Sequence, residues 1–572
     1  YGIYAITGTG ANAINITTGS GVTITSSNGP AIAAGGNTFG SGGITNTGPI
    51  NITNNAALQG LGAAGNAVVE FYNGGTNGGT ITVVNNGTIA AVGNAPAAIA
   101  VEKASTGTFN VSPNGTVNLT NNGSITGLIN LSGAKSAAIA NSGTWTLSGV
   151  NALPAGTSLG NTGTIRASGS TTIQAGLANS GTIDLHGANP AAGDTLTLTG
   201  PYTGGGKLSL DAALGVTASG SACGTQADCL TLTSSSGVTG IIVNNTVPAG
   251  SAGANSGGIL LINGASAAGQ FVIDPATPGY DNGAIDAGFF TYNLNFANNQ
   301  VRLVSAPNRT AFQAPVLVTA AQNVWFETSP WLDRQADLRV QMGPDGSGSV
   351  TPGIWTKATG NFLHRTASLA LTSPGGAILS QNLSYAQNGY ALIGGADIGR
   401  QGAFQSGDAL LAGLMFGYLN SDLRFQDGSA RAGYGGALVG AYVTYLDEEF
   451  FADAAFKANF LSTRYDALSG ISFKPGADAL GGELDMGRRF RLGEKSFVEP
   501  LGSFAFAKTD IDAVPVGGIS LTFPGNKSAR LSQGLRAGSG FSEGDYNGEL
   551  SLTGRVWEEF AGNGAAAVAS AL

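Results

Sequence analysis

The chain has 572 residues, of which 92 are glycine and only 10% are charged, and its formal net charge is −9. Low charge with a positive mean hydropathy excludes a disordered polymer, glycine without a three-residue period excludes collagen, and sparse basic residues exclude a nucleic-acid-binding face. The length predicts two or more structural units. Because the sequence has no run of about 18 apolar residues, no transmembrane helix is predicted, but a membrane β-barrel remains an alternative.

The N-terminal part of the chain repeats the motif Asn-x-Gly-x-(Ile/Trp). The motif reads NTGPI at 46–50, NNGTI at 85–89, NNGSI at 121–125, NSGTW at 141–145, NTGTI at 161–165 and NSGTI at 179–183. The last four copies start about 20 residues apart, and the two earlier gaps are close to twice that. A period near 20 without helical patterning predicts a β-solenoid, in which each coil supplies short strands and turns.

The repeat also predicts what its positions do. Its glycine is expected to supply a positive φ at the corner of each coil, and the equivalent asparagines are expected to stack as an amide ladder. Apolar residues around the motif should point inward and form one long core: Val83, Ile89, Ile125, Trp145, Ile165 and Ile183.

The first 200 residues lack the signatures of an enzyme. Their acidic residues are Glu70, Glu102, Asp184 and Asp194. These carboxylates are too scattered for a glycosidase pair, and no Gly-x-Ser-x-Gly elbow is present. The lone imidazole of His186 is expected at the surface or in a turn. The sequence therefore predicts no catalytic, cofactor or metal site, and a β-helix enzyme acting on glycans remains the alternative.

The two cysteines, Cys223 and Cys229, stand close together in CGTQADC. A short-loop disulfide in an oxidising compartment is the preferred interpretation, and two free thiols are the alternative. A zinc site is not expected, because no second pair of Cys or His lies nearby.

The stretch 223–304 contains CLTLTSSSGVTGIIVNN, GGILLINGASAAGQFVID and AIDAGFFTYNLNFANNQVRLV. It resembles the end of a pertactin-type autotransporter passenger. The segments that carry the resemblance are Ile259–Ile262, Phe271–Ile273, Asp286–Leu294 and Val301–Val304. In that family the segment nucleates passenger folding, so the resemblance implies an autochaperone role; a plain solenoid cap is a compatible alternative.

The stretch 314–341 is almost free of glycine. Pro315 near its start favours a helix, and Ser329 with Pro330 would end this helix and begin a second one. About 20 helical residues span ~30 Å, the thickness of a bilayer core. With GIWTKATG at 353–360, the stretch resembles the linker helix and first barrel strand of autotransporters; two surface helices are the alternative.

The second half alternates polar and apolar side chains with a period of two. In EFFADAAFKANF, 449–460, charged residues share one face and Phe and Ala share the other; GGELDMGRRFR and ELSLTGRVW repeat the pattern. A membrane barrel would turn the charged face to its lumen and the apolar face to lipid. We expect these residues in the lumen: Asp453, Lys457, Glu483, Asp485, Arg489, Arg491, Glu549 and Arg555.

A soluble β-sandwich would show the same alternation, but three features favour a barrel. The strands are long, charges of both signs stand in mid-strand, and aromatic residues near strand ends suggest an interfacial girdle. The girdle residues are predicted to be Tyr418, Tyr434, Tyr445, Phe450 and Phe460. GYALIGGADIGRQGAF, ALLAGLMFGYLNSDLRF and GGALVGAYVTYLDEEFFADAAF resemble successive autotransporter barrel hairpins, a match that covers 353–561.

The ends of the sequence carry two further expectations. About nine strands are predicted between Gly353 and Phe560, whereas the family barrel has twelve, so we expect the natural protein to continue beyond Leu572. Because the chain starts at Tyr1 without a signal segment, a removed signal or a fragment is expected.

The sequence thus predicts an all-β chain in four parts. These are a right-handed parallel β-helix passenger at 1–222, an autochaperone-like cap at 223–305, a linker with a pore-spanning helix at 306–350, and an incomplete antiparallel transmembrane β-barrel at 351–572. The resemblance implies a bacterial outer-membrane autotransporter that displays an adhesin or structural passenger at the cell surface. Implied partners are outer-membrane lipid, the barrel assembly machinery, periplasmic chaperones and an unknown surface ligand, without cofactor or nucleic acid. A soluble secreted β-protein is the remaining alternative.

Overall fold

The computed structural model describes most of the chain. The described residues are 2–7, 11–36, 48–60, 67–72, 79–92, 96–102, 115–187, 190–215, 220–248, 252–255, 257–328, 331–342, 349–372, 378–468, 470–516, 519–543, 546–561 and 567–570. They form two compact units: one comprises 1–248, 252–287 and 291–306, and the other 249–251, 288–290 and 307–572. Among these residues, no helix is long and apolar enough to cross a membrane.

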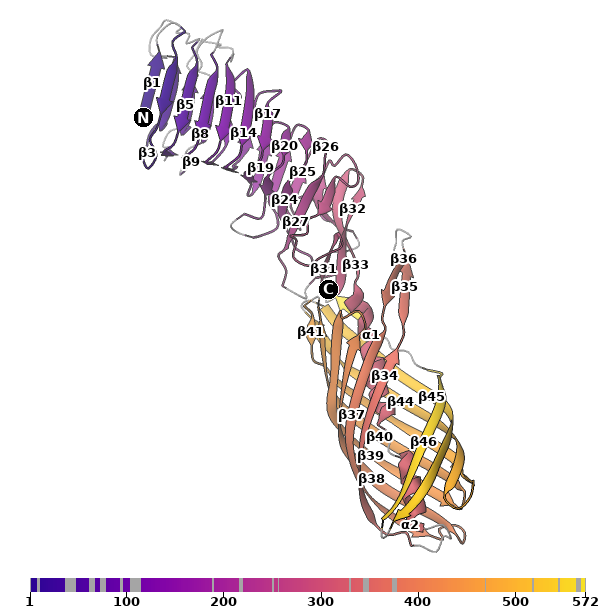
Figure 1. Cartoon of the computed structure of the whole chain (residues 1–572). Helices are drawn as coiled ribbons and strands as arrows, with labels where there is room; N and C mark the ends of the chain where they lie inside the picture. The colour runs from indigo at the N-terminus through magenta and orange to yellow at the C-terminus, as the bar shows by residue number, and fades with distance from the viewer. Residues whose placement is uncertain are drawn as a thin grey trace. The chain divides into compact units, whose positions relative to one another are not determined.

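The first unit is a solenoid of stacked coils (Figure 1). One sheet contains β1 (Ile3–Thr7), β4 (Ile32–Gly36), β7 (Val69–Tyr72), β10 (Ile99–Glu102) and β13 (Ile129–Asn130). A second contains β2 (Ile14–Thr17), β5 (Ile50–Asn54), β8 (Ile81–Asn85), β11 (Thr116–Asn121), β14 (Ser136–Asn141), β17 (Ser158–Asn161), β20 (Leu177–Asn179), β23 (Tyr202–Thr203) and β26 (Ser235–Ser236).

Two more sheets complete the solenoid. The third contains β3 (Thr23–Ser26), β6 (Ala57–Gly60), β9 (Thr88–Ala91), β12 (Ser124–Thr126), β15 (Thr144–Thr146), β18 (Thr164–Arg166), β21 (Thr182–Asp184), β24 (Lys207–Ala212), β27 (Thr239–Asn245) and β29 (Phe271–Ile273). The fourth contains β16 (Val150–Asn151), β19 (Ser170–Ile173), β22 (Thr195–Leu198), β25 (Cys229–Thr231), β28 (Ile259–Asn263), β33 (Gln300–Pro307), β32 (Phe290–Ala297), β31 (Ala284–Ala287) and β30 (Tyr280–Asp281). Parallel pairing between successive coils confirms the predicted β-helix.

The predicted core and amide ladder are both present. All six residues predicted to point inward are buried, from Val83 to Ile183. The Nδ2 atom of Asn121 donates to Oδ1 of Asn141 at 2.6 Å, and Asn141 donates in turn to Asn161 at 2.7 Å. Because these amides are fully buried, each bond also removes a desolvation penalty of about 1–3 kcal/mol.

The start of the ladder differs from the prediction. Asn85 accepts its hydrogen bond from Asn54, which in turn accepts one from Thr18. The motif at 46–50 was therefore wrongly aligned; its first two residues lie outside the described residues. The sequence pattern did not reveal Asn54, because Ala56 stands where later coils have glycine.

The reason for the repeated glycine is also different from the one predicted. Gly123, Gly143 and Gly163 do not have positive φ. Their Cα atoms lie against the coil below instead, so that a Cβ on Gly143 would come 2.0 Å from the carbonyl oxygen of Gly123. The motif thus needs glycine for close approach between coils and not for a left-handed corner.

The last coils change from parallel to antiparallel pairing. β28 pairs with β33 in antiparallel fashion, and the hydroxyl oxygen of the buried Tyr292 lies 2.6 Å from the carbonyl oxygens of both Leu214 and Gly253, which share its single proton. Asn298 and Asn299 both have positive φ and form the turn between β32 and β33. These strands cover the end of the solenoid core, as a cap must.

Two helices precede the second sheet, as predicted: α1 (Arg309–Glu327) and α2 (Trp331–Met342). Helix α1 begins earlier than the prediction, because the side chain of Asn308 caps it by accepting from the backbone N–H of Ala311. Pro315 therefore lies inside the helix.

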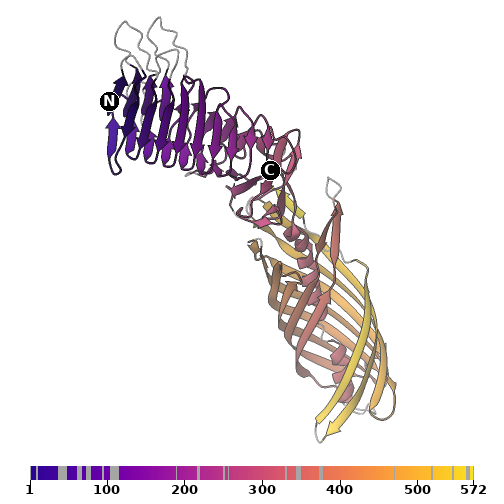
Figure 2. The ribbon, with the colours of Figure 1, turned by 45° about the horizontal axis from the view of Figure 1, so that its top comes forward.

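The rest of the second unit is a long antiparallel sheet that curls around the helices (Figure 2). Its main path runs through β34 (Gly353–Arg365), β37 (Tyr385–Gln401), β38 (Asp408–Phe425), β39 (Ala430–Asp447), β40 (Phe450–Ala467), β42 (Gly476–Arg488), β44 (Ser496–Val516), β45 (Ile519–Glu543) and β46 (Tyr546–Glu559). The short strands β41 (Ser472–Phe473), β43 (Phe490–Arg491) and β47 (Ala567–Ser570) pair beside this path, and β35 (Ser368–Thr372) pairs with β36 (Ile378–Asn382). Nine strands on the path, among the described residues, agree with the predicted number.

The two faces of this sheet carry different side chains. Along β40, Asp453, Lys457 and Asn459 are buried on the concave face, whereas Phe456 and Phe460 are exposed on the convex face. This arrangement confirms the inverted pattern of a membrane barrel.

The predicted aromatic girdle needs one correction. Tyr418, Phe450 and Phe460 lie on the convex face and are exposed, and Tyr445 is half-buried there. Tyr434 is instead buried on the concave face, where its hydroxyl donates to the carbonyl oxygen of Leu317 in α1 at 2.9 Å. Tyr434 and Tyr445 stand at an odd separation on the same strand, β39, so their side chains lie on opposite faces and cannot both belong to the girdle.

Candidate functional site

The concave face of the barrel sheet, called the lumen below, holds α1 by polar contacts along the helix. At its start, Arg309 pairs with Asp427 at 3.4 Å, and Gln313 donates to Ser429 at 2.6 Å. Tyr465 donates its hydroxyl to the side-chain oxygen of Gln313 at 2.9 Å. These contacts place the first turns of α1 beside the turn between β38 and β39.

The middle of α1 is fixed from several strands at once. Arg530 donates to Oδ1 of Asn323 at 2.9 Å, and the indole N–H of Trp325 donates to the backbone oxygen of Lys457 at 3.1 Å. The Lys457 ammonium, 4.5 Å from the centre of the Trp325 ring, donates to the carbonyl oxygen of Thr328 at 2.6 Å. A buried lysine is thus satisfied by the C-terminal end of α1, the end that favours a cation.

Helix α2 is anchored through a second buried contact. Arg334 forms ion pairs with Asp337 of its own helix and with Asp397 of β37. Asp397 also accepts the hydroxyl of Tyr442 at 2.7 Å, and Tyr442 in turn accepts the indole N–H of Trp355 at 2.7 Å. The aspartate that binds α2 is thus positioned by side chains from β39 and β34 as well as by its own strand, β37.

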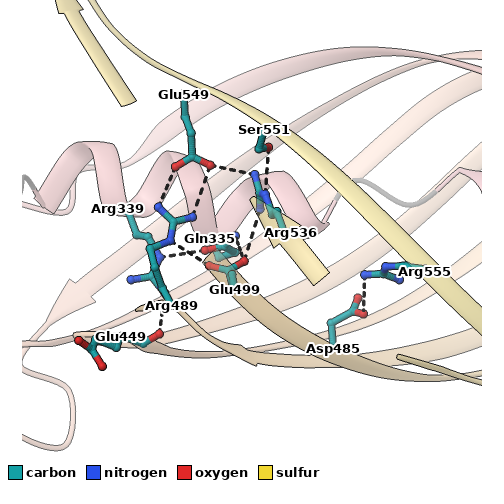
Figure 3. Close-up of polar contacts among 10 residues, drawn as sticks. All are labelled: Gln335, Arg339, Glu449, Asp485, Arg489, Glu499, Arg536, Glu549, Ser551 and Arg555. Atoms are coloured by element: carbon teal, nitrogen blue, oxygen red, sulfur yellow. Dashed lines mark hydrogen bonds and ion pairs between the residues drawn. The ribbon is translucent and has the colours of Figure 1, made fainter. Parts of the chain in front are cut away.

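The largest charge cluster lies beside the last turns of α2 (Figure 3). Glu499 is fully buried and lies 2.9 Å from Arg489 and 3.8 Å from Arg536. Glu549 pairs with the same two arginines, at 2.8 and 3.0 Å. Gln335 of α2 donates to Glu499 at 3.4 Å, so the helix takes part in the network. Interlocked pairs of this kind satisfy charges that would be costly to bury alone.

The other predicted lumen residues lie on the same face with different surroundings. Asp485 is buried and pairs with Arg555 at 3.4 Å. Asp453 faces Asp485 across β40 and β42. Glu483 is half-buried, and Arg491, at the end of β43, is exposed.

The sequence reasoning missed several lumen residues. Arg334, Asp397, Glu499, Arg530 and Arg536 all belong to the networks. Alternation in FVEPLGSFAFAKTD puts Glu499 on the face opposite Phe504 but also opposite Lys508, so the pattern alone does not assign its face. The pairing of Arg334 with Asp397 leaves no such signal, because the two are joined only by the fold.

The solenoid holds a small buried cluster of its own. The Nδ1 atom of His186 lies 2.6 Å from Oδ1 of the buried Asp211, so this histidine has a specific partner. Asp228 accepts the backbone N–H groups of Gly193 and Asp194, both at 2.9 Å, and that of Asp211 at 2.7 Å. Nearby, a disulfide joins Cys223 to Cys229. The cluster ties neighbouring coils together.

We expect Asp228 to make the stability of the solenoid depend on pH. Burial raises the pKa of Asp228 to about 6, against the opposing effect of its backbone N–H donors. Between pH ~4 and ~6 the folded state then binds more protons than the unfolded state, so stability falls as pH rises through this window, by on the order of 2 kcal/mol. Urea unfolding of the full chain at pH 4.5 and 7, followed by circular dichroism, measures the difference. Asp228→Asn should reduce it, and an unchanged difference would contradict the assignment.

The C-terminal part of the chain matches a known family. Residues 375–572 match the model described as the autotransporter β-domain. Among solved structures, the chain is similar to the β-domain of the Bordetella autotransporter BrkA, with 18% identity and a TM-score of 0.28, over 36% of this chain and 80% of that chain. No curated protein matches the chain.

The curled antiparallel sheet, its polar lumen and its apolar convex face agree with the family match. Together they assign the sheet to the bacterial outer membrane, with the chain that precedes α1 at the cell surface. Residues 375–572 of this chain therefore form an autotransporter β-domain.

Proposed function

We propose that the solenoid is a passenger with an adhesive or structural role and without catalytic activity. The observation that supports this proposal is the uniformity of its coils: Thr144, Thr164 and Thr182 occupy equivalent positions on successive strands. A surface of repeated hydroxyl and amide side chains suits an extended stalk or a broad contact face better than a single catalytic pocket.

The barrel supplies export and anchoring, and the linker helices connect it to the passenger. Helix α1 forms hydrogen bonds with four strands of the sheet. Asn323 bonds to β37 and β45, Leu317 bonds to β39, and Trp325 bonds to β40. As partners of this process we propose the barrel assembly machinery and periplasmic chaperones during biogenesis, and a surface ligand of the passenger afterwards.

Protease shaving of intact cells that express the natural gene tests this topology. One epitope is placed near residue 100 and a second in the turn at 402–407, which lies at the periplasmic end of the strands. We expect loss of the first epitope and retention of the second. Protection of both, or recovery of both in the medium, would overturn the proposal.

A second measurement separates the adhesive role from an enzymatic one. Cells that display the passenger are compared with cells shaved of it, for adhesion to glycan-coated surfaces and for release of reducing sugars from the same glycans. Adhesion without sugar release is expected, and sugar release that disappears on shaving would instead make the passenger a glycan-degrading enzyme.

A further inference from the structure

The convex face of the barrel sheet has a groove across β37, β38, β39 and β40. The groove has a volume of about 730 Å³, and its walls include Ile398, Leu414, Val443 and Phe456. All four of these side chains are exposed. The sheet therefore has a hollow within the surface that faces the hydrocarbon of the membrane.

The hollow arises from small residues between large ones in two neighbouring cross-strand rows. One row runs Ile398, Ala412, Val443, Ala454, and the next runs Ala396, Leu414, Ala441, Phe456. Each alanine lies beside a large apolar side chain of the adjoining strand, so its short side chain forms the floor of the groove. A hydrocarbon chain fits such a floor and such walls.

A single positive charge lies next to the groove. Arg400 follows Ile398 by two residues on β37 and therefore projects from the same face. Its side chain is exposed, and it forms no ion pair or hydrogen bond with any described residue. Leu410 is its cross-strand neighbour, and Tyr445 is the next residue in that row. A guanidinium in the same cross-strand row as an aromatic residue, at the edge of an apolar band, is suited to a phosphate at the membrane interface.

The fold gives the side of the membrane on which Arg400 lies. Helix α1 starts beside Asp427, and the chain that precedes it is at the cell surface. Helix α2 ends at the opposite side, where Arg339 donates to the backbone oxygens of Glu448 and Glu449. Arg400 is near the β37–β38 turn, and Asp408 at that turn pairs with Asp447, next to Glu448. Arg400 is therefore at the periplasmic edge of the band.

We propose that this groove and Arg400 form a binding site for one phospholipid of the periplasmic leaflet, with an acyl chain in the groove and the headgroup phosphate on the guanidinium. Two features of the structure select this occupant. The groove is continuous with the lipid-facing band, and the unpaired cation is complementary to a phosphate. This proposal rests on the location of the barrel in the membrane and is independent of the adhesive role proposed for the passenger.

Photo-crosslinking of the full chain in nanodiscs tests the site. Two probes carry the same diazirine on an acyl chain: a phosphatidylglycerol, and a diacylglycerol that lacks the phosphate. We expect the phosphatidylglycerol to label peptides around Ala412 and Ala454 about fivefold more than the diacylglycerol does, the difference that one interfacial charge pair makes. Equal labelling by the two probes would overturn the role of the phosphate.

Matched variants separate the parts of the site. Arg400→Gln should lower phosphatidylglycerol labelling to the diacylglycerol level, whereas Arg424→Gln, an exposed arginine at the other end of the strands, should not. Ala412→Trp should fill the groove and abolish labelling there by both probes, whereas Ala437→Trp on the same convex face should leave it intact. Folding of each variant is checked by its heat-dependent mobility on a gel. If Arg400→Gln or Ala412→Trp is folded and labelled like the parent, the site does not exist.

Discussion

Substitution of Gly143 by alanine is expected to unfold the solenoid coils around it. The new Cβ would lie 2.0 Å from the carbonyl oxygen of Gly123 and 2.8 Å from the backbone carbon of Asn122. Backbone atoms cannot move aside as a flexible side chain can, so the coils must separate and the ladder bond between Asn121 and Asn141 must lengthen. We expect a loss of about 3 kcal/mol or more, the upper range for overpacking a close contact. Pulse proteolysis of the full chain over a urea series measures the loss.

Gly160→Ala provides the control for this experiment. Gly160 is in the next coil and has no positive φ, and a Cβ on this residue would meet no atom within 4 Å. A methyl group there should change stability by less than about 1 kcal/mol, and it could even stabilise the strand. Equal sensitivity of the two variants to the protease would contradict the steric role assigned to the motif glycine.

Replacement of Glu499 by glutamine is expected to destabilise the barrel strongly. Glu499 is fully buried, and Arg489 and Arg536 depend on it together with Glu549. Removal of its charge leaves two buried guanidiniums with a single carboxylate, and breaking a buried pair in this way costs about 3–5 kcal/mol. For a unit of this size we expect the midpoint of thermal unfolding in detergent to fall by roughly 10 °C.

Asp510→Asn removes the same charge from an exposed pair. Asp510 pairs with Lys508 at 2.6 Å, and both side chains are about half exposed to solvent. The expected effect is below about 1 kcal/mol. Similar midpoints for the Glu499 and Asp510 variants would mean that the lumen network does not contribute more than a surface ion pair.

Local patterns in the sequence were sufficient to predict those parts of the fold in which the structure repeats or alternates. The Asn-x-Gly motif identified the coils from Asn85 to Asn179, and the alternation along β40 assigned Asp453 and Lys457 to the lumen. Both patterns directly reflect the geometry of a strand, in which side chains alternate between two faces. The fold class and the order of the parts followed from them together with the resemblance to autotransporters, because alternation alone does not distinguish a membrane barrel from a soluble sandwich.

Other features depend on contacts between distant segments and had no local signal. Asn54 joins the ladder although its coil lacks the motif glycine, and Arg334 of α2 pairs with Asp397 of β37. The alternation of large and small residues around Ala412 and Ala454 becomes a groove only when four strands lie in register. Such properties belong to the pairing of strands and cannot be read from one strand alone.

The amide ladder has a direction. Each asparagine donates its Nδ2 to the Oδ1 of the next coil toward the C-terminus, from Asn54 through Asn85, Asn121, Asn141 and Asn161 to Asn179. A stack that grows from its C-terminal end therefore always offers an open acceptor to the coil that arrives next. On such a stack, the side-chain hydrogen bond of an arriving coil can form as soon as its own asparagine is in place. We propose that the free energy of folding is released coil by coil outside the membrane, which would oppose the return of the chain and give transport a direction without a nucleotide.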